Sequence, residues 1–180
     1  MKKKIVITVI AAVLVLGCAV GGTIAWLVQM RTLTNTFVAG NIEIELTEST
    51  GSTYLLIPGA TLAKNPKVTV KHGSEPCWLF VRIEQTGAAD AYLSYEVAEG
   101  WQALDGVAGV YYREVPEATL DHAYFVLKDN VVHVSDAVTE AEMEALTDQT
   151  NPKLTFTAYA VQRMGFDAVS AAWAEAEALV

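Results

Sequence analysis

The chain has 180 residues, of which 52% are hydrophobic, and its 21 Asp and Glu against 12 Lys and Arg give a formal net charge of -9 at pH 7. This length suits one domain with a sizeable hydrophobic core. The acidic balance argues against nucleic acid or an anionic membrane surface as a partner, because both would repel the chain.

The N-terminus has the layout of an export signal. Three lysines at positions 2–4 precede 26 residues without a formal charge. A basic start, an apolar stretch and then small residues are what a secretion channel and a signal peptidase recognise. Thr23 and Ala25 approximate the pattern of small residues at a cleavage site. The pattern predicts a signal peptide over residues 1–25 and a mature chain that begins at Trp26.

Two other interpretations of this segment stay open. About 20 apolar residues suffice to cross a bilayer, so the uncleaved signal would be a membrane anchor, the one expected contact with a membrane. Cys18 follows Gly17 in a loose lipoprotein-like box, but Leu16 fits that pattern poorly.

Removal of residues 1–25 leaves 155 residues with 9 basic and 21 acidic side chains, a net charge of -12, and Cys77 as the only cysteine. No intramolecular disulfide is then available, so stability must come from packing. The strand pattern around Cys77 favours a small buried hydrophobe over a reactive thiol.

Beyond the signal, the pattern predicts short strands separated by turn residues. Ile42, Ile44 and Leu46 alternate with polar residues, which gives the first strand one solvated face. The predicted strands are 37–46, 67–71, 77–84, 93–97, 110–115, 124–127, 131–134 and 154–162. Their spacing, without alternating helices, predicts a mainly β chain: one antiparallel β-sandwich domain of jelly-roll type over residues 36–180.

One face of the strand 77–84 carries Cys77, Leu79, Val81 and Ile83. Because successive side chains point to opposite sides of a strand, these four residues are predicted to enter the core together.

Two short peripheral helices are predicted near the C-terminus. Thr139 and Glu142 form a capping box that starts the first helix. The acidic residues of this helix are explained by the helix dipole, so no metal site is assigned there. The second helix, 167–179, has apolar residues at helical spacing and is expected to close one end of the sandwich. Its apolar stripe consists of Phe166, Val169, Trp173, Ala176 and Val180.

No catalytic motif is present. The chain lacks the zinc-peptidase HExxH, the GxSxG nucleophile turn, the phosphate-binding loop and the EF-hand spacing. His72, His122 and His133 are scattered, and a structural or solvated role is expected for each. The sequence therefore predicts no catalytic, cofactor-binding or metal-binding residue, no cofactor and no enzyme activity.

The sequence resembles the TasA and camelysin family. GGTIAWL at 21–27 and TFVAGNIEI at 36–44 look like the start of that family, and LIPGATLAKNPKVTV at 56–70 resembles its Pro-Gly turn and following strand. Further similar segments are EPCWLFV at 75–81, LTFTAYAVQ at 154–162, GFD at 165–167 and AW at 172–173. The resemblance covers both ends and leaves residues 88–150 unmatched.

This resemblance implies a secreted jelly-roll subunit of the Gram-positive extracellular or biofilm matrix, located in the matrix or at the cell surface. It implies processing by a signal peptidase of the SipW type and polymerisation into fibres. An accessory assembly protein is left open as a further partner.

Strand donation supplies a physical mechanism for polymerisation. The freed segment 26–35 is largely apolar, and an extended segment of this kind can add to an open sheet edge of a neighbour. Head-to-tail repetition of this contact gives a homopolymer, because nothing closes the ring. The candidate donor side chains are Trp26, Val28 and Met30 on one face and Leu27 and Leu33 on the other. The alternative is that this segment folds back onto its own domain or forms a disordered stub.

Two other functions come from different classes. The camelysin branch carries a metallopeptidase attribution, but zinc hydrolysis needs about three converging ligands, and the histidines lack the short spacings that favour this. A monomeric surface adhesin needs only an exposed patch. Trp101, Tyr111 and Tyr112 are candidates for such a patch, although strand aromatics are more often core.

Overall fold

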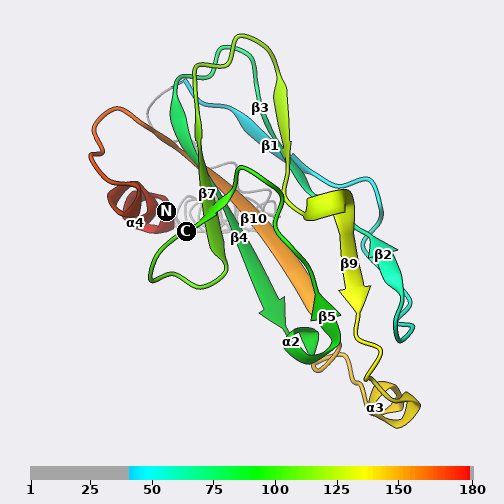
Figure 1. Cartoon of the computed structure of the whole chain (residues 1–180). Coiled ribbons are helices and arrows are strands. Elements are labelled where there is room, and N and C mark those ends of the chain that lie inside the picture. The colour runs from blue at the N-terminus through cyan, green and yellow to red at the C-terminus, as the bar shows by residue number, and fades with distance from the viewer. Residues whose placement is uncertain (1–40, 179–180) are drawn as a thin grey trace, which may run out of the picture. The chain divides into compact units, whose positions relative to one another are not determined.

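The computed structural model describes residues 41–178, which all belong to one compact unit spanning residues 35–180 (Figure 1). The predicted signal peptide, its cleavage site and the donor segment 26–35 lie outside the described residues. No helix within residues 41–178 is long and apolar enough to cross a bilayer.

Ten strands within residues 41–178 form three antiparallel sheets. The strand orders are β1-β3-β8, β10-β4-β7-β6 and β2-β9-β5. The strands are β1 (Ile44–Thr47), β2 (Thr61–Ala63), β3 (Lys67–Val70), β4 (Cys77–Thr86), β5 (Leu93–Ser94), β6 (Gln102–Ala103), β7 (Val110–Val115), β8 (His122–Phe125), β9 (Val131–Val134) and β10 (Lys153–Gln162).

Short helices connect or cover these strands. The helices described are α2 (Ala89–Tyr92), the 3-10 turn η1 (Lys128–Asn130), α3 (Glu140–Glu144) and α4 (Val169–Ala178). The predicted capping box at the start of α3 is confirmed. The Thr139 backbone N–H donates to Glu142 Oε2 at 2.8 Å, and the Glu142 N–H donates to Thr139 Oγ1 at 3.3 Å.

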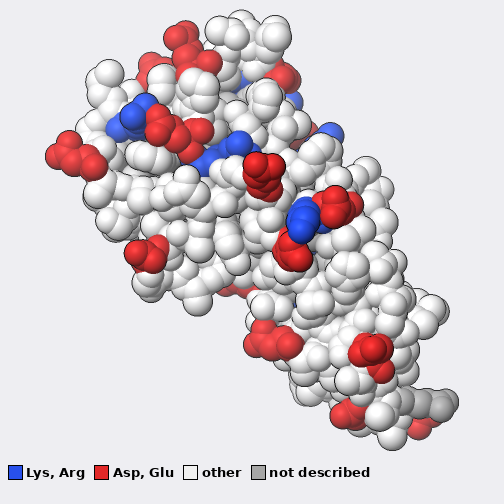
Figure 2. Space-filling model, viewed as in Figure 1, with Lys and Arg blue, Asp and Glu red and all other residues white. Residues whose placement is uncertain are grey.

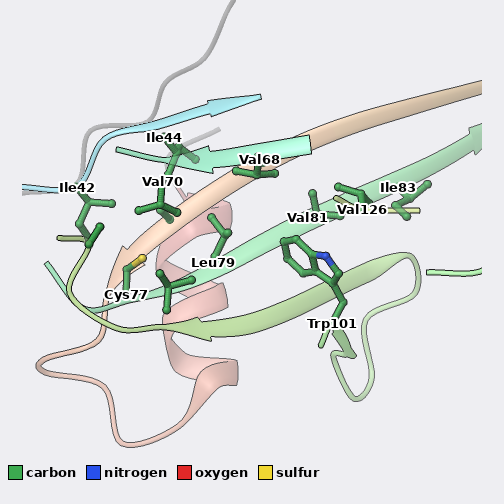
Figure 3. Close-up of a cluster of buried hydrophobic side chains, with 14 of the residues drawn as sticks. Ile42, Ile44, Val68, Val70, Cys77, Leu79, Val81, Ile83, Trp101 and Val126 are labelled. Atoms are coloured by element: carbon green, nitrogen blue, oxygen red, sulfur yellow. The ribbon is translucent and has the colours of Figure 1, made fainter. Parts of the chain in front are cut away.

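The first core lies between β4 and the β1-β3-β8 sheet (Figure 3). Cys77, Leu79, Val81 and Ile83 all enter it from one face of β4, as the two-residue period predicts. Across from them, the buried side chains of β1 and β3 include Ile44, Val68 and Val70. Buried side chains of this kind contribute about 1.5–3 kcal/mol each to folding.

The second core lies on the opposite face of the four-stranded sheet. Phe80 points from β4 to this side and packs against Trp173 of α4, with ring centroids 5.3 Å apart. Tyr159 of β10 meets the same indole edge-on at 5.3 Å. Helix α4 therefore covers a sheet face, and the expectation that it closes one end of a sandwich is wrong.

The mainly β, antiparallel fold is confirmed, and β7 and β9 have the predicted bounds. Strands β2 and β6 were not predicted, and β8 begins two residues before the predicted strand 124–127. Within the described residues, the first strand is limited to Ile44–Thr47. Three small sheets do not by themselves establish the jelly-roll order.

The acidic residues are dispersed over the face shown in Figure 2. They form scattered groups there, and basic residues lie beside several of them. The ion pairs of the chain include Lys71 with Glu45 at 2.6 Å and Arg82 with Glu177 at 2.5 Å. The excess negative charge therefore forms no single binding patch on this face.

Candidate functional site

Strand β10 is an edge strand of the four-stranded sheet. It pairs with β4 along its whole length, from Lys153 opposite Thr86 to Gln162 opposite Cys77. On its other side no strand among residues 41–178 is paired with it. Ten residues of strand are about 30 Å long. Such an edge presents unpaired N–H and C=O groups that can bind another extended chain.

A groove of about 590 Å³ lies at the start of this edge. Its apolar lining comes from four strands of two sheets: Leu62 of β2, Leu93 of β5, Val132 of β9 and Leu154 of β10. Val132 is buried in the first core, and Leu93 and Leu154 pack against that core. In Figure 1 the start of β10 lies next to β5 and β9. The groove therefore lies beside the first core and next to a strand edge that no other strand within residues 41–178 covers.

A polar cluster, the clasp, holds the loop that forms one wall of the groove. Lys64 Nζ donates to both Glu48 carboxylate oxygens, at 2.8 and 2.9 Å. The Tyr54 hydroxyl donates to Glu48 Oε1 at 2.9 Å and lies 2.7 Å from the Gly51 carbonyl oxygen. The Lys64 ammonium also lies 5.3 Å from the Phe156 ring centroid of β10. The clasp therefore connects the loop, the residue that follows β2, and β10.

The clasp also changes the acidity of its carboxylate. Burial acts to raise the pKa of Glu48, but hydrogen bonds from Lys64, Thr50 and Tyr54 outweigh burial and lower the pKa from its ordinary value of 4.5. The lowered pKa keeps Glu48 ionised, and the ion pair with Lys64 intact, at neutral pH.

The loop turns alternate side chains toward the groove and toward solvent. Leu56 lines the groove, whereas Leu55 is 75% exposed and Ile57 is 52% exposed. Exposed large apolar residues next to an apolar groove are a feature of interaction surfaces. Sequence reasoning missed this loop because it has no regular secondary structure.

The described chain begins near the other end of β10. The Glu75 N–H donates to the Asn41 carbonyl at 2.9 Å, and the Gln162 side chain donates to Glu75 Oε2 at 2.6 Å. Asn41 therefore lies at the Gln162 end of β10, and the groove lies at the Lys153 end. The two ends are about 30 Å apart.

The predicted donor and cleavage residues, Thr23, Ala25, Trp26, Leu27, Val28, Met30 and Leu33, lie outside the described residues. The three histidines make separate contacts. His72 lies in a turn, His122 stacks on Tyr124 with ring centroids 4.5 Å apart, and His133 Nδ1 is 2.9 Å from Thr61 Oγ1. Within residues 41–178, no three His, Cys, Asp or Glu side chains form a group that could hold a metal ion.

Cys77, considered as a reactive thiol, and the aromatic residues considered for an adhesin patch contribute mainly to the cores. Cys77 is fully buried, and this burial raises the pKa of its thiol to about 12. Trp101 is 8% exposed and its Nε1–H donates to the Phe125 carbonyl at 2.8 Å. Tyr111 and Tyr112 pack against the first and second cores, respectively. These aromatics do not form the exposed patch that an adhesin would need.

Residues 1–74 match the family model described as camelysin metallo-endopeptidase. This match supports the resemblance to the camelysin and TasA family at the family level. The matched range contains strands β1, β2 and β3. The similar segments 75–81 and 154–173 lie beyond the matched range. No curated protein and no solved structure matches the chain.

Proposed function

We propose that this chain, a relative of the camelysin and TasA family through its N-terminal 74 residues, is a secreted structural protein that assembles into matrix fibres. The observation that carries this proposal is the ten-residue edge of β10, which no other strand of residues 41–178 covers and which lies beside an apolar groove. An edge with an adjoining groove is suited to accept a strand from another chain.

Export precedes assembly in this proposal. A signal peptidase of the SipW type cuts after Ala25, and Trp26 becomes the first residue of the mature protein. The family match covers residues 1–74, which include the predicted signal and the segment 26–35. Removal of the three lysines and the apolar signal leaves a soluble, acidic chain with a largely apolar end.

Assembly then proceeds by strand donation between identical chains. The freed segment adds to an open sheet edge of a neighbour, where backbone hydrogen bonds supply affinity and the groove selects apolar side chains. Each copy has one donor segment and one acceptor edge, so the contact repeats head to tail and gives an open fibre. The sheets of each subunit are proposed to form a jelly-roll-type sandwich that the donated strand extends.

A peptidase function is the second candidate, and the name of the matching family favours it. The described residues provide no three-ligand metal group, so such a site would have to involve residues outside 41–178 or another chain. The test is peptide cleavage by the purified mature chain with and without a chelator. Activity that is lost with the chelator and restored by zinc would favour the peptidase.

The fibre proposal is tested with the chain 26–180 and a shorter chain that begins at Thr36. Both contain all core residues that the structure describes, so both are expected to fold. Light scattering and negative-stain microscopy at rising concentration should show filaments from the longer chain and monomers from the shorter. Monomers from both chains would contradict self-assembly through residues 26–35.

A further inference from the structure

The three arginines within residues 41–178 share one arrangement, in which the guanidinium lies over the ring of a tryptophan. The pairs, with the distance from the arginine Cζ to the ring centroid, are Arg82 with Trp173 at 4.9 Å, Arg113 with Trp101 at 5.3 Å and Arg163 with Trp78 at 5.8 Å. All three distances are in the range of cation–π contacts. Because the same arrangement occurs three times, its members can be compared with one another.

Two of the three guanidinium groups also have a carboxylate partner. Arg82 Nη2 lies 2.5 Å from Glu177 Oε1, and Arg163 Nη1 forms an ion pair with Glu114 Oε1. Within the described residues no carboxylate forms an ion pair with Arg113. Contact with an indole therefore does not replace the carboxylate at two of these arginines, and at the third the carboxylate is missing.

The surroundings of Arg113 make this missing partner unfavourable. The Arg113 Cζ lies 4.0 Å from the Tyr124 ring centroid, and its Nε–H is buried without a hydrogen-bond partner among the described residues. Burial lowers the pKa of Arg113 from its ordinary value, although Tyr124 acts to raise it. A guanidinium nevertheless stays charged in a protein. A partly desolvated cation is therefore left without a compensating anion in this part of the chain.

The guanidinium of Arg113 can still be reached from outside. The residue is half-buried, so part of it faces solvent. A guanidinium that stacks on a ring keeps its N–H groups in its own plane, where two of them can bind both oxygens of a carboxylate. Gly100 leaves room for this group, because a Cβ at that position would lie 2.8 Å from Arg113 Nη2.

We infer that Arg113 binds a carboxylate group that another molecule supplies, either a small organic acid or an acidic side chain of a second copy of the chain. This carboxylate takes the place that Glu177 has beside Arg82 and Glu114 has beside Arg163. A carboxylate is assigned, and not another anion, because both related arginines bind one. The inference does not depend on the proposed function, since Arg113 does not line the groove.

The inference is tested by titration of the isotope-labelled chain 26–180 with sodium acetate at pH 7. Nuclear magnetic resonance is recorded at a protein concentration at which light scattering shows monomers. Two signals report on the site: the Nε–H of Arg113 and the indole N–H of Trp101, which donates to the Phe125 carbonyl. We expect both signals to shift with acetate and to reach a plateau, while sodium chloride at the same ionic strength leaves them in place.

Three variants make the test specific. Arg113→Lys keeps the charge but loses the pair of parallel donors, so acetate should bind about ten-fold more weakly, as measured by the Trp101 signal. Arg163→Lys is the matched control and should leave the Trp101 response unchanged. Glu177→Gln removes the carboxylate beside Arg82, so the Nε–H signal of Arg82 should then also shift with acetate.

A dilution series without acetate identifies the source of the carboxylate. Arg113 signals that shift as the protein concentration rises indicate an acidic side chain of a second copy. Signals that stay in place over this series, but shift with acetate, indicate a small organic acid.

Equal responses of the Arg113 signals to acetate and chloride would overturn the inference, and so would an undiminished Trp101 response in Arg113→Lys. The titration of the unmodified chain decides the first point without any variant. Equal melting temperatures of Arg113→Lys and the unmodified chain exclude misfolding as the cause of a weaker response. Failure of the chain to form filaments would contradict the proposed function alone.

Discussion

Trp173 is the residue whose removal tests the second core most directly. Its side chain is 3% exposed and lies 5.3 Å, between ring centroids, from both Phe80 and Tyr159. The Arg82 guanidinium lies 4.9 Å from the indole centroid. We predict that Trp173→Ala detaches α4 from the sheet face.

The contacts set the magnitude of this effect. Loss of a buried Trp to Ala costs about 3–5 kcal/mol in unfolding free energy. The buried Nε1–H of Trp173 has no hydrogen-bond partner among the described residues, which makes the native indole less favourable than its burial suggests. Trp173→Phe removes that unpaired donor and keeps part of the packing, so its cost should be only about 1–2 kcal/mol.

Urea unfolding followed by circular dichroism measures these differences in the chain 26–180. A loss of about 4 kcal/mol corresponds to a fall in Tm of about 8–16 °C for a protein of this size. Met164→Ala is the control, because Met164 is 82% exposed and should change stability by less than about 0.5 kcal/mol. A Trp173→Ala variant within 1 kcal/mol of the unmodified chain would refute the packing of α4 on this face.

Three further perturbations test the site and its surroundings. Gly87→Ala should lower the unfolding free energy measured in urea by more than about 2 kcal/mol, because at φ +64° the new Cβ would lie 2.2 Å from the Asn151 carbonyl oxygen. Gly106→Ala is the control: its φ is +77° but the space around it is open, so it should cost about 1 kcal/mol. Glu48→Gln should speed amide hydrogen exchange in residues 49–56 at pH 7, because it removes the ion pair of the clasp. Since the pKa of Glu48 is lowered, the clasp stabilises the chain above pH 4.5, and this stabilisation is lost as the pH falls through the lowered pKa. The exchange rates of the variant and the unmodified chain should therefore converge in acid. Cys77→Ala should make the unfolding free energy fall less steeply with pH between about pH 9 and about pH 12. The reason is that the thiol has a pKa of about 12 in the folded chain and ionises at lower pH in the unfolded chain. Equal slopes of unfolding free energy against pH for both proteins would contradict this.

Local signals in the sequence identified much of the fold. The period of two in β4 placed four side chains in the first core, and the Thr139 and Glu142 pair marked the start of α3, because both patterns depend only on neighbours in the chain. Strands β2 and β6 have three and two residues, too few to show a period, so tertiary pairing alone defines them.

The groove could not be found in this way. The groove is lined by Leu62, Leu93, Val132 and Leu154, which are separated by 31, 39 and 22 residues in order along the chain. They meet only in the folded chain, where strands of two different sheets come together. The clasp likewise joins Glu48 to Lys64 across a connection without regular structure. A faint signal for the edge existed at Lys153, because a lysine at the start of an apolar strand is typical of an edge strand.

The difference between β4 and β10 explains why one sheet can be both stable and able to accept a strand. From Cys77 to Arg82, strand β4 is paired on both sides, and most of its side chains there are buried in one of the two cores. This part of β4 therefore has no edge to offer to another chain. Strand β10 is buried toward Gln162 but half-exposed toward Lys153, where the groove lies. An exposed edge of this length is an aggregation hazard, and the charge of Lys153 together with the loop held by the clasp limits access to it.

In the proposed mechanism, the complementary segment 26–35 stays joined to the signal peptide until cleavage after Ala25. Donor and acceptor then become available to each other only after export, which confines polymerisation to the outside of the cell.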